Sequence, residues 1–245
     1  MFTQTERLIA VRNLRPKRKQ GFLKIISLFS FLGIMLGVAI LIIVMSVMNG
    51  FRSDLTEKII GLNPHLILQF NNEKDLKSTK KILSTKYKNI NMTESISGEG
   101  IILANNKAKG IFIKGISKKD KFQSFKNKKI IKGNLNDFTA GTVMIGGELA
   151  YNLNLETGDK INIVSSSYID TPFGSIPMQD NFRIAGLFDS GFYEFDQNLI
   201  YLELNDGRSI FNKQDDSVDL EVFLKNPFLA EKYKKDIENI NQNIF

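Results

Sequence analysis

The chain has 245 residues, of which 42% are hydrophobic and 24% charged, and it carries a formal net charge of +7 without any cysteine. Residues 1–24 hold seven basic side chains and one acid, so they carry +6 of this charge and residues 25–245 only +1. A domain that binds nucleic acid along a folded face would carry its positive excess there, and a small disulfide scaffold needs cysteines. The composition therefore excludes both classes.

Residues 1–21 are predicted to be a cytoplasmic amphipathic basic segment that begins with a short helix at the inner membrane surface. Thr3 and Glu6 have the spacing of a capping box, and Pro16 marks the end of the helical pattern. The apolar residues of the expected face are Leu8, Val11 and Leu14. A frayed basic tail is the alternative for this segment.

An uncharged apolar stretch of 24 residues comes next, from Ile25 to Met48. As a helix it would reach roughly 36 Å, enough to cross a hydrocarbon core of about 30 Å. Because the basic cluster precedes it, we expect the N-terminus in the cytoplasm and the C-terminal portion on the other side. A cleaved signal peptide is the alternative, but its apolar region has about 7–15 residues and ends in a small-residue site. Residues 46–50 contain no such site, so the sequence predicts an uncleaved anchor.

The helical pattern continues beyond the apolar stretch. Phe51, Leu55, Ile59 and Leu62 recur at helical spacing among charged residues, and the residue before Pro64 is disfavoured in a helix. The sequence therefore predicts one helix over residues 22–62, which crosses the membrane and then continues as a stalk.

Residues 63–245 are predicted to form a mixed α/β domain, undivided or in two lobes, because short apolar strand patterns alternate with helical ones. Helical spacing marks residues 76–90 and 229–240. The expected strands are 65–70, 100–103, 110–116, 142–145, 161–164, 182–188, 199–202 and 218–224. The fold class is thus α+β, with one N-terminal transmembrane helix and stalk leading into a mixed α/β domain.

No motif in this chain indicates catalysis. There is no G-x-x-x-x-G-K-[ST] phosphate-binding loop, and the single histidine, His65, has no cysteine or histidine companions for a metal site. Asp189, Glu194 and Asp196 could work as paired acid and base, but a turn whose carboxylates accept backbone N–H groups is the simpler interpretation. We therefore predict no catalytic residues, no metal and no cofactor.

The connection from Ser165 to Asn181 stands out because its 17 residues exceed the length of ordinary loops. Proline at the second and glycine at the fourth place of residues 171–174 predict a type I turn. The apolar side chains of the connection are unfavourable in water without a partner; they are Tyr168, Ile169, Phe173, Ile176 and Met178. Either residues 165–181 form a hook-like loop that binds a partner, or they fold back onto their own domain.

With these segments in view, the chain resembles the LolC/LolE-type permease subunits of the lipoprotein-releasing ABC transporter of Gram-negative inner membranes. The likeness covers most of the chain, and its motifs come in a specific order and spacing. They are Val11-Arg12-Asn13-Leu14-Arg15, Ser46-Val47-Met48-Asn49-Gly50-Phe51, Gly61-Leu62-Asn63-Pro64-His65, Leu155-Glu156-Thr157-Gly158-Asp159, Thr171-Pro172-x-Gly174-x-Ile176-Pro177 and Glu194-x-Asp196.

The resemblance implies a fold and two binding regions. Residues 63–245 would be a two-lobed, MacB-like periplasmic domain, and residues 165–181 would be the hook that binds a periplasmic lipoprotein carrier. The implied hook residues are Thr171, Pro172, Phe173, Gly174, Ile176, Pro177 and, at the base, Gln179. Asn162 and Asp180 stand where the family has a basic pad. The residues implied to line a cavity for lipid tails share one helical face; they are Leu41, Val44, Met48 and Phe51.

Under this interpretation the protein is an inner-membrane permease subunit, not an enzyme, that extracts lipoproteins and hands them to the carrier. Its implied partners are an ABC ATPase subunit, a second permease subunit of the same or a related kind, the carrier, lipoprotein substrates and membrane lipid. Family members have three further membrane helices after the periplasmic domain, so we expect this chain to be an N-terminal portion or a truncated reading frame. The alternatives are a mechanotransmitting permease of the MacB/FtsX type and a single-pass anchored periplasmic binding module.

Overall fold

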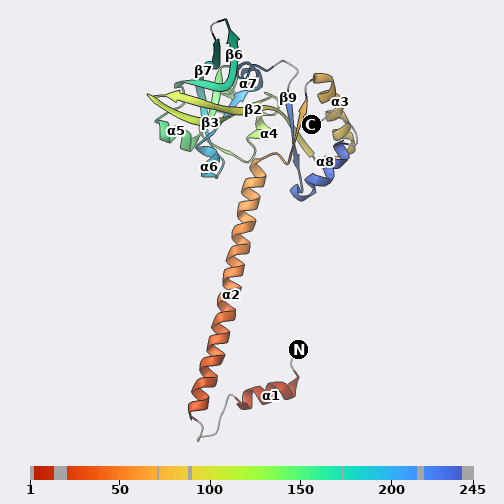
Figure 1. Cartoon of the computed structure of the whole chain (residues 1–245), viewed down its shortest axis with the longest axis vertical. Coiled ribbons are helices and arrows are strands. Elements are labelled where there is room, and N and C mark those ends of the chain that lie inside the picture. Colours follow the sequence, from red (N-terminus) through yellow and green to blue (C-terminus); the bar gives the residue numbers. More distant parts are fainter. Residues whose placement is uncertain are drawn as a thin grey trace. The chain divides into compact units, whose positions relative to one another are not determined.

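The computed structural model describes residues 3–13, 21–70, 72–87, 90–172, 174–213 and 218–238. The chain divides into two units, Met1–Thr56 and Glu57–Phe245. The first unit is helical, and the second contains all the β-strands of the described chain (Figure 1).

Helix α1 (Gln4–Asn13) begins with the predicted capping box. The Thr3 backbone N–H donates to Glu6 Oε2 at 2.9 Å, and the Glu6 N–H donates to Thr3 Oγ1 at 3.4 Å. The amphipathic face of Leu8, Val11 and Leu14 stays a prediction. Leu8 and Ile9 are 66% and 59% exposed, and as neighbours they lie about 100° apart around the axis. Leu14 and Pro16 lie outside the described residues.

Helix α2 (Gly21–Leu62) runs for 42 residues and ends just before Asn63 and Pro64, as predicted. Within it, Ile25–Asp54 is long and apolar enough to cross a membrane, and the described chain has one such segment. None of its most apolar window is buried within the protein. An unburied apolar helix of this length is unstable in water, which supports the predicted membrane span.

The second unit is built on a nine-stranded sheet with helical segments between its strands. The strands are β1 (Leu66–Phe70), β2 (Ile90–Ala104), β3 (Lys107–Ile116), β4 (Lys129–Gly133), β5 (Thr142–Gly146), β6 (Lys160–Thr171), β7 (Gly174–Asp189), β8 (Leu199–Glu203) and β9 (Val218–Leu224). The helical segments are α3 (Glu73–Lys86), α4 (Lys121–Ser124), η1 (Leu135–Asp137), α5 (Gly147–Leu153), α6 (Tyr193–Asp196), α7 (Leu204–Ile210), η2 (Pro227–Leu229) and α8 (Ala230–Glu238).

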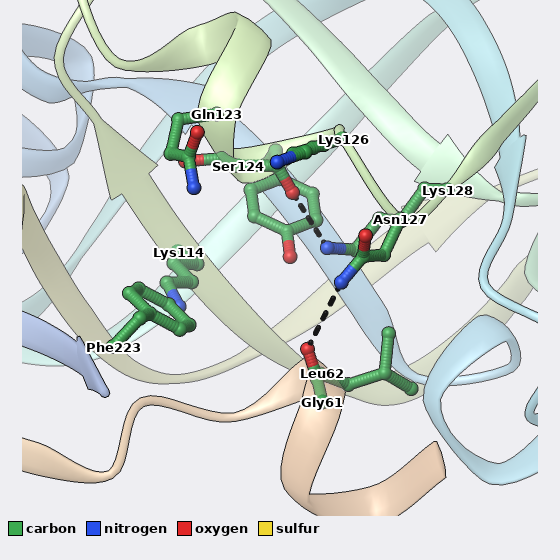
Figure 2. Close-up of a pocket in the computed structure, with 10 residues that line it drawn as sticks. Gly61, Leu62, Lys114, Gln123, Ser124, Lys126, Asn127, Lys128 and Phe223 are labelled. Carbon is green, nitrogen blue, oxygen red and sulfur yellow. Dashed lines mark hydrogen bonds between the residues drawn. The ribbon is translucent and has the colours of Figure 1, made fainter. Parts of the chain in front are cut away.

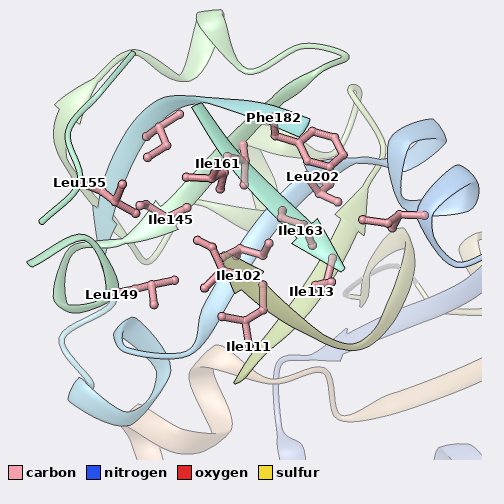
Figure 3. Close-up of a cluster of buried hydrophobic side chains, with 14 of the residues drawn as sticks. Ile102, Ile111, Ile113, Ile145, Leu149, Leu155, Ile161, Ile163, Phe182 and Leu202 are labelled. Atoms are coloured by element: carbon pink, nitrogen blue, oxygen red, sulfur yellow. The ribbon is translucent and has the colours of Figure 1, made fainter. Parts of the chain in front are cut away.

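Six of the strands close into a ring, in the order β2-β3-β8-β5-β7-β6 and back to β2. Each of them contributes inward side chains to the largest hydrophobic cluster, which Figure 3 shows. Ile102, Ile113, Ile145, Ile163 and Leu202 are fully buried there. Because burial of one such side chain is worth about 1.5–3 kcal/mol, this cluster is the main source of the domain's stability.

Strand β2 joins the ring to a second packing region. Its first part, residues 90–95, pairs with β9, while residues 100–103 pair with β6. Beyond β9 lies β1, and helices α3 and α8 supply Leu76, Leu83 and Ile237 to a separate core over these strands. The expected two lobes correspond to the closed ring and to the β1–β9 region, which strand β2 joins.

The outer halves of β6 and β7 are the main difference from the sequence prediction. The expected 17-residue loop is a two-stranded hairpin in which Tyr168 pairs with Pro177 and Ile169 with Ile176 (Figure 1). Pro177 is compatible with a strand here because, among the described strands, β7 pairs only with β6 over residues 174–181. Cross-strand pairing, which single-strand patterns do not reveal, thus orders the segment.

Candidate functional site

The hairpin presents two different faces. Residues directly opposite each other share a face, so Tyr168 and Pro177 lie on one side, and Ile169 and Ile176 on the other. Tyr168 is 59%, Ile169 43% and Ile176 54% exposed. Large apolar side chains are therefore held in water on both faces of a narrow ribbon, a feature typical of a protein interaction site.

Hydrogen bonds fix the end of the hairpin. Thr171 Oγ1 donates to the Gly174 carbonyl at 2.7 Å, and Ser175 Oγ donates to Asp170 Oδ1 at 2.6 Å. Gly174 has a φ of +121°, which favours glycine at this position. Phe173 lies outside the described residues, so the predicted type I turn stays a prediction.

The base of the hairpin is anchored through a bulge. The register shifts between Val164 and Tyr168, where β6 carries extra residues opposite β7. Ser165 lies in this bulge and is buried, donating its hydroxyl hydrogen to the Ile210 carbonyl and accepting the Ser167 N–H. A bulge bends its strand and changes the direction of the residues beyond it, so the Ser165 contact sets the direction of the ribbon.

The other sequence-predicted residues at the base are polar and accessible. Gln179 is exposed and lies opposite Val164, and Asp180 is exposed as well. Asn162 donates from Nδ2 to Asn181 Oδ1 at 3.2 Å. These three positions present amide groups and one carboxylate.

The four residues implied to line a lipid cavity lie on helix α2 and are all more than half exposed. Leu41 is 61%, Val44 56%, Met48 58% and Phe51 59% exposed. Residues on other faces are equally exposed, such as Val47 at 67%. Exposure is therefore similar on different faces of the helix and does not distinguish the face that would line a lipid cavity. The cavity lining stays a prediction.

The acidic turn after β7 is structural, as the sequence indicated. Both carboxylate oxygens of Asp196 accept the Ser190 N–H, at 3.0 and 3.1 Å, and Asp189 Oδ1 accepts the Gly191 N–H at 2.7 Å. Burial raises the pKa of Asp196. His65 is also structural, because its Nδ1 accepts the Leu224 N–H at 2.7 Å.

A charged cluster that sequence reasoning missed lies beside the last turn of α2. It borders a pocket of about 50 Å³ lined by Gly61, Leu62, Lys114, Lys128 and neighbouring residues (Figure 2). Lys114 Nζ lies 2.8 Å from Glu221 Oε2, and the two side chains are only 12% and 5% exposed. Ser95 donates its hydroxyl hydrogen to the same carboxylate at 2.8 Å.

Lys128 completes this cluster, and no carboxylate of the described residues forms an ion pair with it. Its Nζ donates to the Ser124 carbonyl at 2.7 Å (Figure 2). It also lies over the rings of Phe125 and Tyr201. Burial, with repulsion by Lys114, lowers the pKa of Lys128 to about 8, although Glu221 and Asp196 act in the opposite direction. Because the groups come from four separate segments, no local motif could have identified the cluster.

Comparison with known proteins agrees with this architecture. The family described as MacB-like periplasmic core domain matches residues 27–240. The LolC lipoprotein-releasing system transmembrane protein of Neisseria meningitidis is 27% identical over 228 residues, which are 91% of this chain and 55% of the relative. Its Haemophilus influenzae counterpart is 30% identical over 234 residues, or 90% of this chain and 56% of the relative.

The second protein of this kind in Haemophilus influenzae, LolE, is also similar, at 26% identity over 231 residues, which cover 91% of this chain and 55% of LolE. The chain thus spans about half the length of these curated relatives. The resemblance carried by the sequence motifs is confirmed by these matches. The chain therefore belongs to the family of proteins with a MacB-like periplasmic core domain, alongside the LolC and LolE transmembrane proteins.

Proposed function

We propose that the protein is a permease subunit of an ATP-driven lipoprotein exporter. It extracts lipoproteins from the inner membrane and passes them to a periplasmic carrier, while a separate ABC subunit hydrolyses ATP. Its named relatives are transmembrane proteins of lipoprotein-releasing systems. A second permease subunit, of the same or a related kind, completes the membrane part.

The observation that carries this proposal is the β6–β7 hairpin. It places Ile169 and Ile176 as a cross-strand pair with both side chains in water. A lipoprotein carrier must bind acyl chains and so has apolar surface to offer, and an apolar ribbon on a fixed base suits capture of such a partner. The hook residues Thr171, Pro172, Gly174, Pro177 and Gln179 would give the ribbon its shape and polar edge.

The proposed topology rests on charge. The basic residues before Ile25 keep the N-terminus in the cytoplasm, Ile25–Asp54 crosses the bilayer, and residues 63–245 lie in the periplasm. The face of Leu41, Val44, Met48 and Phe51 would then contact the lipid tails of the substrate, where an apolar lining with a flexible methionine suits acyl chains.

Site-specific photocrosslinking in cells that carry the complete transporter tests this function. A photoreactive phenylalanine at Ile176 should capture the periplasmic lipoprotein carrier. The matched control is Ile101, which is 45% exposed on β2 but outside the hairpin, and it should capture none. If the Ile176 position gives no carrier product in a folded, assembled transporter, the hairpin is not the carrier site.

A further inference from the structure

Residues 117–129 hold a concentrated positive charge that the proposed function does not use. They contain six lysines and one acid, a net charge of +5, whereas the rest of the chain after Lys24 sums to −4. These residues comprise the connection after β3, helix α4 and the approach to β4. We call them the basic segment.

The fold turns these charges outward. Lys118, Lys119, Lys126 and Lys129 are exposed, and no carboxylate in the described parts of the chain lies within 4.0 Å of their ammonium groups. The one acid, Asp120, is directed the other way, since its Oδ2 accepts the Glu94 N–H at 3.1 Å. The exposed charged side chains of the basic segment are therefore all lysines.

The basic segment is held in place by its buried members. Lys121 Nζ donates to the Leu135 carbonyl at 3.0 Å, and Phe125 packs in an aromatic cluster with its ring centroid 4.7 Å from that of Tyr201. Phe122, between these two anchors, is 62% exposed. The large apolar side chain of Phe122 is thus exposed to solvent between lysines, on a backbone that the two buried residues hold in place.

The basic segment also lies close in space to Gly61, a residue that follows the apolar span closely in the sequence. It lines the pocket beside Gly61 and Leu62, and Asn127 Nδ2 lies 3.5 Å from the Gly61 carbonyl oxygen. Gly61 comes seven residues after Asp54, the last residue of the apolar span, and seven residues reach at most about 25 Å even when fully extended. With Ile25–Asp54 in the bilayer, as proposed above, chain connectivity keeps Gly61 within this distance of the lipid surface.

We propose that the basic segment is a membrane-surface contact that binds anionic phospholipid headgroups. The four exposed lysines contact lipid phosphates, and Phe122 enters the boundary between headgroups and acyl chains. Lysines near an anionic surface and an aromatic anchor between them are the elements of interfacial binding. The contact would hold the folded domain against the bilayer, independently of any carrier or lipoprotein.

The chain contains no tryptophan, so Phe122→Trp provides a single fluorescent reporter. The full chain is reconstituted in phosphatidylcholine vesicles that contain phosphatidylglycerol, with bromine on the acyl chains of one lipid or the other. Tyr168→Trp, on the hairpin and 59% exposed, is the matched control. Unchanged thermal unfolding of both variants shows that they are folded.

We expect emission at position 122 to be quenched by brominated phosphatidylglycerol, and less so by brominated phosphatidylcholine, while position 168 stays unquenched. Each Lys→Gln change at 118, 119, 126 or 129 should weaken the contact about fivefold, and high salt should abolish it. The proposal is overturned if the fluorescence at position 122 is not quenched, or if the lysine changes leave the quenching unaltered. It is also overturned if the fluorescence at position 122 changes only when a second protein subunit is added.

Discussion

The buried hydroxyl of Ser165 donates a hydrogen bond to the carbonyl of Ile210, the last residue of α7, at the point where β6 departs from regular pairing. The contact joins the base of the hairpin to a helix that packs on the closed ring of strands. The direction of the ribbon thus depends on the Ser165 side chain. Ser165 is the first of three successive serines, a pattern that predicts only a loop.

Ser165→Ala should therefore loosen the hairpin and lower stability. The Ile210 carbonyl would lose its buried donor, at a cost of about 1–3 kcal/mol. Thermal unfolding and amide hydrogen exchange across residues 165–181 measure the two effects. Ser175→Ala, which removes an exposed hydroxyl bonded to Asp170, is the control and should leave unfolding unchanged. Equal behaviour of the two variants would contradict the anchoring role.

Gly174→Ala should distort the end of the ribbon without disturbing the domain. A φ of +121° is strained for any residue with a Cβ, at about 1–3 kcal/mol. Capture of the carrier should fall, and exchange of hairpin amides should rise. Gly110→Ala is the matched control, because both glycines have open space around a Cβ but only Gly174 has a positive φ. A loss of capture in both variants would point to a cause other than hairpin shape.

Glu221→Ala should be severely destabilising. It leaves the Lys114 side chain, 12% exposed, without its partner at 2.8 Å. Breaking a buried pair in this way costs about 3–5 kcal/mol. The control is Glu94→Ala, whose pair with Lys80 at 2.7 Å has side chains 35% and 28% exposed, so about 0–1 kcal/mol is expected. Denaturant unfolding measures the stability lost in each variant. Similar losses would show that burial does not determine how much the Lys114–Glu221 pair contributes to stability.

Lys128 should make stability rise with pH. Its pKa is lowered from 10.5 to about 8 in the folded chain, so between these values the unfolded chain binds more protons than the folded one. Stability attributable to this group therefore increases as the pH rises from about 8 towards 10.5. Lys128→Met should flatten the rise in melting temperature over this range. An unchanged slope in the variant would assign the pH dependence to other groups.

Much of the fold could be predicted because local patterns were unambiguous. The strand expected at residues 218–224 is β9 to the residue, and the long helix ends before Pro64 as predicted. Strand β2 was expected only at residues 100–103, because its first part carries Thr93, Glu94 and Ser95, which look like loop residues. In the structure Thr93 and Ser95 donate hydrogen bonds to Glu221 on the neighbouring strand.

The sequence alone predicted neither the short helices nor the charged cluster beside α2. Leu149, Ala150 and Leu153 bury one face of α5, but one or two turns are too short for a reliable periodicity. Burial of Asp219 and Glu221 in β9 depends on strands that are distant in sequence. The family motif predicted which residues form the hook, whereas their hairpin geometry depends on pairing between β6 and β7.

Transfer of a lipoprotein from proteoliposomes to the soluble carrier tests the central claim most directly. The complete transporter with Ile169→Ser and Ile176→Ser should hydrolyse ATP at the normal rate but deliver little lipoprotein to the carrier. Both side chains are exposed, so each change should alter the free energy of unfolding by no more than about 0.5 kcal/mol. Normal delivery by this folded double variant would contradict a carrier-binding role for the β6–β7 hairpin.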